Sequence, residues 1–182
     1  MSLLKRLEEE LKCGENAIRF LESYKDKPEM RDRIAWEMID IFQYTKSCKV
    51  LDIISDILTK YRDTPTFAEV IIKRLNDIAW YERQEKILKF VSEIYLNDYV
   101  KDAIMDYRKY SDIGERALWE IGSITWYTRS YEPAILLSQV LTDYKERPEK
   151  VKEILIKASD IAWETRNAEA VKNFLQKIDK KS

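Results

Sequence analysis

Residues 78–83 read Ile-Ala-Trp-Tyr-Glu-Arg, and three other stretches of the chain repeat this pattern. They are residues 41–46 (Ile-Phe-Gln-Tyr-Thr-Lys), 124–129 (Ile-Thr-Trp-Tyr-Thr-Arg) and 161–166 (Ile-Ala-Trp-Glu-Thr-Arg). The four stretches align without gaps and lie 37, 46 and 37 residues apart. Self-similarity at such a period is typical of repeat proteins, so this motif decides the fold.

A second marker keeps the same phase along the chain. Tyrosines with the same three spacings occur at Tyr24, Tyr61, Tyr107 and Tyr144. Four positions after each tyrosine stands a residue that favours a helix start, namely Pro28, Pro65, Ser111 and Pro148. Because two markers share one spacing, we expect four repeats. The longer interval predicts a nine-residue insertion (46 against 37) in the third repeat, near residues 96–99.

Each repeat reads as a long helix followed by a shorter one. Proline is tolerated in the first turn of a helix, where the backbone donors are unpaired anyway, so the long helices are expected to begin at the prolines. Thr64 is placed as an N-cap, and Asp112 with Glu115 has the spacing of a capping box. The long helices are expected to end near four cations that suit the helix dipole: Lys46, Arg83, Arg129 and Arg166.

Short connections make consecutive helices antiparallel, and stacking covers the apolar face that one hairpin leaves open. We therefore predict an all-α fold, a right-handed α-α superhelix (solenoid) of about four to five antiparallel helical hairpins in one domain, 1–182. The repeats span approximately 14–46, 47–83, 84–129 and 130–166, with a terminal capping helix over 167–182. A short leucine-striped helix is expected before Gly14. A compact helical bundle is the alternative architecture.

Two stretches resemble known repeats. Residues 130–137 (Ser-Tyr-Glu-Pro-Ala-Ile-Leu-Leu) look like the second helix of a tetratricopeptide repeat that closes at Pro148, with Ala134 at the small-residue position. Residues 116–125 (Arg-Ala-Leu-Trp-Glu-Ile-Gly-Ser-Ile-Thr) are similar to the inner helix of a HEAT repeat. The period of 37 lies between the periods of these two families, about 34 and about 40–47 residues. The resemblance implies a class of architecture that is most often used for scaffolding and macromolecular binding.

On a helical wheel the long helices carry an apolar stripe on one side and aromatic residues on the other. The stripe of the first long helix runs through Ile34, Met38 and Ile41. The candidate binding groove consists of Trp80, Trp126, Trp163, Trp36, Trp119, Asp40, Asp77 and Asp160. Because Trp is enriched at binding hot spots, we interpret this face as an aromatic groove with an acidic edge. It suits an extended peptide or a basic, amphipathic helix.

Both residue types of the groove have a structural interpretation as well. A solenoid helix touches its partner and two neighbouring repeats, so the tryptophans and Tyr44, Tyr81 and Tyr127 can fill gaps between repeats. The aspartates can pair with basic residues of the next repeat and set its register. Regular spacing over different repeats argues against a single catalytic pair of carboxylates.

Composition excludes several function classes. Lys and Arg number 32 against 33 Asp and Glu, so the basic excess that duplex-binding proteins usually carry is absent. The chain has no histidine, which removes the usual zinc ligand sets and histidine-based triads. Its three glycines stand alone and form no phosphate-binding loop. We expect no catalytic residue, cofactor or metal.

The location of the chain is inferred from its cysteines and its hydropathy. Cys13 and Cys48 form no CxxC pair, and we expect free intracellular thiols. The chain begins without the apolar core of a signal peptide, and no window approaches the ~18 apolar residues of a membrane span. We therefore predict a cytoplasmic protein, and the dense mixture of both charges is compatible with a thermophilic source.

These observations favour a non-enzymatic scaffold that binds a protein or peptide, with basic residues, through its concave face. Nucleic-acid binding, with Asp77 or Asp160 beside a tryptophan, is the second hypothesis. A purely structural homo-oligomer is the third.

Overall fold

The computed structural model describes residues 15–179, and these residues form ten helices and no strand. The prediction of an all-α chain is confirmed over this range. The helix expected before Gly14 lies outside the described residues. No helix in residues 15–179 is both long enough and apolar enough to cross a lipid bilayer.

Four long helices have the same length of 18 residues. They are α3 (Pro28–Thr45), α5 (Pro65–Glu82), α8 (Ser111–Thr128) and α10 (Pro148–Thr165). Each begins at the residue predicted from the tyrosine and proline spacing. The shorter helices are α2 (Glu15–Glu22), α4 (Cys48–Lys60), α6 (Glu85–Ile94), α7 (Asp98–Met105), α9 (Glu132–Asp143) and α11 (Ala168–Asp179).

The four marker tyrosines are buried and fix the turn before each long helix. In every case the tyrosine carbonyl accepts a hydrogen bond from the N–H three residues on, at 2.8–2.9 Å; the donors are Lys27, Thr64, Tyr110 and Arg147. The next residue starts the helix. The constant spacing of four residues between tyrosine and helix start therefore reflects one repeated turn anchored by a buried ring.

The predicted N-cap position of Thr64 is confirmed, whereas the predicted capping box of α8 is wrong. Thr64 is the N-cap of α5, but its hydroxyl donates to the Tyr61 carbonyl at 3.3 Å and caps no helical N–H. Tyr110 is the N-cap of α8, which places Asp112 inside the first turn and rules out a capping box with Glu115. The turn has already fixed the backbone at these helix starts. Side-chain capping occurs instead at short helices, as at Ser47, which accepts from the Val50 N–H at 3.2 Å.

The chain divides into two compact units, Met1–Glu93 and Ile94–Ser182, called here the N-terminal and C-terminal units. Two short helices, α6 and α7, separate α5 from α8, with a break of three residues between them, whereas one short helix separates α3 from α5 and α8 from α10. The break lies at the site of the predicted nine-residue insertion, next to the boundary between the units.

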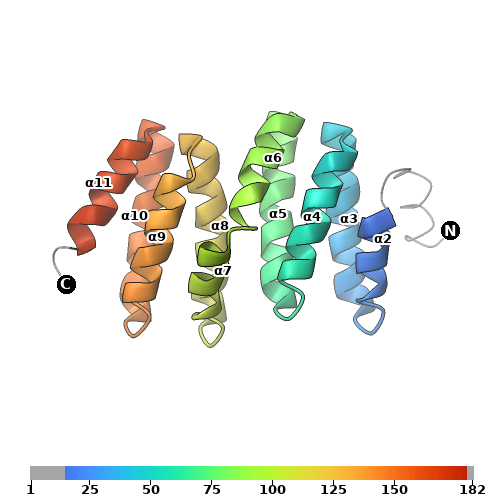
Figure 1. The fold of residues 1–182 in the computed structure, drawn as a ribbon, viewed down its shortest axis with the longest axis horizontal. Helices are drawn as coiled ribbons and strands as arrows, with labels where there is room; N and C mark the ends of the chain where they lie inside the picture. Colours follow the sequence, from blue (N-terminus) through green and yellow to red (C-terminus); the bar gives the residue numbers. More distant parts are fainter. Residues whose placement is uncertain (1–14, 180–182) are drawn as a thin grey trace. The chain divides into compact units, whose positions relative to one another are not determined.

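The N-terminal unit has two layers of helices. The long helices α3 and α5 pack side by side, and α2 packs on α4 in the other layer (Figure 1). The predicted stripe of Ile34, Met38 and Ile41 is completely buried between the layers.

Cys48, at the start of α4, is disulfide-bonded, so the prediction of a free thiol is wrong for this residue. Cys13 lies outside the described residues.

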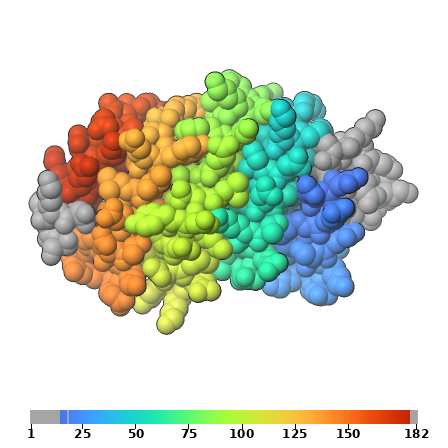
Figure 2. Space-filling model, viewed as in Figure 1, coloured from blue at the N-terminus to red at the C-terminus, as the bar shows by residue number. Residues whose placement is uncertain are grey.

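The C-terminal unit repeats this plan with α8 and α10 in one layer and α7, α9 and α11 in the other (Figure 1). Side chains fill the space between its neighbouring ribbons (Figure 2). Two buried tyrosines tie the layers and neighbouring helices together: the Tyr95 hydroxyl donates to the Leu118 carbonyl at 2.9 Å, and Tyr107 donates to Leu141 at 2.6 Å. Burial, together with the Asp106 carboxylate, raises the pKa of Tyr107, which keeps its phenol a donor.

Candidate functional site: the tryptophan face of the long helices

In the N-terminal unit the predicted tryptophans lie on the surface. Trp36 on α3 is 46% exposed and Trp80 on α5 is 50% exposed. The Trp80 ring meets Tyr81 edge-on, with ring centroids 4.7 Å apart. Both tryptophans thus present a large part of their surface to solvent.

In the C-terminal unit an aromatic and arginine cluster forms at the end of α8 and α10. The rings of Tyr127 and Trp163 lie 5.1 Å apart, and the Arg166 guanidinium lies 4.3 Å from the Trp163 ring and 4.5 Å from Tyr127. Trp163 remains 56% exposed despite these contacts. We call Tyr127, Trp163 and Arg166 the C-terminal cluster. Stacking holds the Trp163 ring in place while one part of its surface stays free.

The two other tryptophans of this unit are not equivalent to Trp163. Trp126 is only 8% exposed and packs on Tyr127, with ring centroids 4.8 Å apart. Trp119 is half-buried. The predicted groove residues of this unit thus divide into an exposed tryptophan, a half-buried one and one that belongs to the core.

The aspartates of the predicted acidic edge lie on the outer side of their helices. Asp77 and Asp160 are exposed and Asp40 is half-buried. Asp77 pairs with Arg74 of its own helix, at 3.3 Å. Each exposed aspartate precedes an exposed tryptophan by three residues, Asp77 before Trp80 and Asp160 before Trp163, which places both side chains on one side of the helix.

Contacts that fix the register of α3 and α5 come from other residues. Arg33 binds the Glu69 carboxylate, with Nε 2.7 Å from Oε1, and Asn76 donates to Glu37. Burial opposes ionisation of Glu69, but hydrogen bonds and charge from Arg33 and Lys73 lower its pKa overall. In the N-terminal unit, the sixth and tenth residues of α3 therefore reach α5, which residue spacing alone did not predict. The same two positions of α8, Arg116 and Glu120, instead pair with each other at 2.7 Å.

The cations at the ends of the long helices have a role that dipole arguments did not predict. Lys46, Arg83, Arg129 and Arg166 are the C-caps, and all four adopt left-handed backbone angles, with φ of 50–53°. Glycine usually occupies this position. Arg83 lies 5.6 Å above the Tyr44 ring, and Arg166 lies above the Tyr127 ring. Each of these tyrosines belongs to the long helix that precedes the one ended by the arginine. The sequence carried one signal of this role, because each of the four cations is the last residue of a repeated motif stretch.

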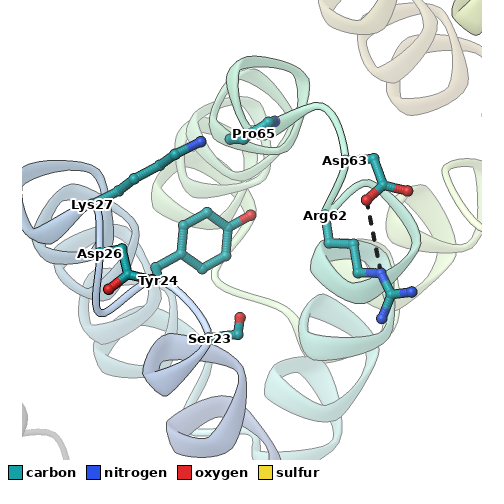
Figure 3. A pocket seen from close by; sticks show the side chains of 7 residues that line it. All are labelled: Ser23, Tyr24, Asp26, Lys27, Arg62, Asp63 and Pro65. Carbon is teal, nitrogen blue, oxygen red and sulfur yellow. Dashed lines mark ion pairs between the residues drawn. The ribbon is translucent and has the colours of Figure 1, made fainter.

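A pocket of about 270 Å³ in the N-terminal unit lies between the loops that precede α3 and α5 (Figure 3). Its lining includes Asp26, Lys27, Arg62 and Asp63, two charges of each sign, with Arg62 and Asp63 4.0 Å apart. The Tyr24 hydroxyl is buried there and has no hydrogen-bond partner among the described residues. Because the charges cancel, the pocket favours neither an anion nor a cation.

Residues 15–179 contain no group of three or more His, Cys, Asp or Glu side chains placed to hold a metal ion.

Comparison with known proteins finds no matching family model, no matching curated protein and no matching solved structure.

Proposed function

We propose that the chain is a non-enzymatic scaffold that binds a peptide segment of another protein through the tryptophan-bearing face of its long helices. In this proposal the hairpins form a single right-handed α-α superhelix of the HEAT-like or tetratricopeptide-like kind. The long helices line its concave side.

The observation that carries the proposal is the exposure of Trp36, Trp80 and Trp163. Tryptophan buries much apolar area at a small entropic cost, and it is enriched among residues that dominate binding energy. Trp163 is also held by Tyr127 and Arg166, which reduces the conformational freedom that it would lose on binding. A fixed, half-exposed aromatic ring is a suitable anchor for a partner.

The neighbouring charges favour a partner with basic residues. Asp77 and Asp160 stand one helical turn before Trp80 and Trp163, and Glu164 is exposed beside Trp163. A lysine or arginine of the partner can pair with the carboxylate and contact the aromatic ring in the same position. A proline-rich or acidic segment would bring no cation to the exposed carboxylates of Asp160 and Glu164.

The experiment is a selection of peptides from a random display library on the immobilised full chain, followed by affinity measurement with the purified peptides. Trp80→Ala combined with Trp163→Ala is expected to weaken binding at least about tenfold, since hot-spot truncations cost about 2 kcal/mol or more. The matched control is Tyr99→Ala, which removes an aromatic ring of similar exposure, 46%, from α7 in the other layer. Equal losses in both variants, or enrichment of no peptide, would contradict the proposal.

A cytoplasmic location also stays a prediction. Disulfides are rare in reducing compartments outside hyperthermophiles. The disulfide at Cys48 therefore weighs against the cytoplasm of an ordinary mesophile and is compatible with a hyperthermophilic source.

A further inference from the structure

A second surface of the C-terminal unit lies on the side of α10 and α11, away from the C-terminal cluster. It is a hollow of about 330 Å³ whose floor is apolar, formed by Tyr144, Ile154, Phe174 and Ile178. Phe174 and Ile178 are half-buried, whereas Ile154 and Tyr144 are buried. Three charged side chains, Lys150, Glu153 and Lys157, complete the lining, and all three are exposed.

Two of these charges occupy positions that elsewhere contact a neighbouring helix. Glu153 and Lys157 are the sixth and tenth residues of α10, as Arg33 and Glu37 are of α3. In α3 these two positions bind Glu69 and Asn76 of α5. Ile154 corresponds likewise to Ile34, which is completely buried. The α10 residues at the rim and floor of the hollow therefore correspond to the surface of α3 that packs against α5 in the N-terminal unit.

In α10 this surface has no such neighbour among the described residues. Glu153 and Lys157 form no ion pair there, and both remain exposed. Their signs are the reverse of those in α3, where a cation stands at the sixth position and an anion at the tenth. A helix that fits this edge must therefore carry a cation where α5 has Glu69 and an anion where α5 has the uncharged Asn76.

We propose that the hollow between α10 and α11 binds an amphipathic helix of another protein. This helix presents a lysine or arginine to Glu153 and, seven residues further on, a carboxylate to Lys157. The separation of seven residues is that of Glu69 and Asn76 in α5. Apolar residues between these two positions cover the floor at Ile154 and Phe174.

Charge complementarity disfavours docking of α3 from a second copy of this chain on the hollow. The residues of α3 that correspond to Glu69 and Asn76 are Asp32 and Ile39. A copy that docked its α3 on this edge would place the Asp32 carboxylate opposite Glu153 and give Lys157 no polar partner. Like charges in direct contact oppose association.

The test uses two labelled peptides and the full chain. The first copies α5, Pro65–Glu82, with Glu69→Lys and Asn76→Glu, and the second copies the same segment unchanged. Fluorescence anisotropy should show that the first peptide binds about tenfold more tightly at low salt, and the difference should shrink as salt is added. The double variant Glu153→Lys, Lys157→Glu should reverse this preference, and circular dichroism checks that it is folded.

Equal affinities for the two peptides, or a preference that survives the charge reversal in the protein, would overturn the proposal. Sedimentation over a concentration series supplies a second readout. A monomer at all concentrations is expected, whereas a dimer that the double variant disrupts would assign the edge to a second copy and refute a helical partner. Because Trp163 does not line this hollow, loss of peptide binding in the Trp80 and Trp163 variants leaves this test unaffected.

Discussion

Trp126 and Trp163 occupy equivalent positions in the repeated motif but differ in exposure, which allows a direct test of which tryptophan belongs to the core. We expect Trp126→Ala to destabilise the protein much more than Trp163→Ala. Trp126 is 8% exposed and contacts Tyr127, whereas Trp163 is 56% exposed and contacts Tyr127 and Arg166.

The size of the difference follows from the buried area. A tryptophan side chain offers roughly 200 Å² for burial, so about 180 Å² of Trp126 and about 90 Å² of Trp163 are covered. At about 25 cal/mol per Å², these areas correspond to about 4.5 and about 2 kcal/mol. The first value agrees with the 3–5 kcal/mol, roughly, that Trp→Ala substitutions cost in cores. We therefore expect Trp126→Ala to lower the free energy of unfolding by about 2 kcal/mol more than Trp163→Ala.

Thermal unfolding followed by circular dichroism measures this difference. In a chain of this size 1 kcal/mol shifts Tm by about 2–4 °C, so Trp126→Ala should melt about 4–8 °C below Trp163→Ala. Equal melting temperatures would refute the reasoning, because Trp163 would then be as much a part of the core as Trp126. Its exposed ring could no longer be assigned to binding.

Three further predictions concern single contacts. Tyr107→Phe removes the hydrogen bond to the Leu141 carbonyl and should cost about 1–2 kcal/mol in urea unfolding. Tyr24 stands at the equivalent position, and its hydroxyl has no partner within residues 15–179, so Tyr24→Phe should be neutral or stabilising. Equal losses in the two variants would contradict this. Lys46→Gly should stabilise the protein by about 1 kcal/mol, because glycine adopts the left-handed backbone angles of this position without steric strain. Arg166→Gly should give no such gain, because it also loses the contacts with Trp163 and Tyr127. Equal gains in the two variants would contradict the role given to the ring contacts. The pKa of Glu69 in the folded protein lies below its ordinary value of 4.5, so the stability that its ionised form contributes is present above pH 4.5 and is lost as the pH falls through the folded pKa. Glu69→Gln should therefore lose less stability than the wild type between pH 6 and pH 3. Parallel pH profiles of the free energy of unfolding would contradict this prediction.

The helix starts could be predicted because they depend on local chemistry. Proline fixes the backbone of a first helical turn. The buried tyrosine and its turn occupy the four residues before the helix, so the tyrosine and the helix start recur in the sequence at a constant separation. The insertion in the third repeat was predicted for the same reason, since a change of spacing is visible without knowing the structure.

The exposure of individual tryptophans could not be predicted in this way. Trp126 and Trp163 have the same wheel angle, but burial depends on which helices and side chains lie beside them, and the periodicity of one helix does not contain that information. The left-handed caps were missed because glycine, their usual signal, is replaced by lysine or arginine. The disulfide of Cys48 was missed because spacing along the chain does not report proximity in space.

The central claim is that exposed tryptophans of the long helices contact the partner and that Trp126 does not. The most direct measurement is ¹⁹F NMR of the protein labelled with 5-fluorotryptophan, titrated with the peptide obtained by display selection; substitution of single tryptophans assigns the signals. We predict that the signals of Trp80 and Trp163 shift with increasing peptide while that of Trp126 stays in place. A peptide that binds without moving the Trp80 and Trp163 signals would contradict the account.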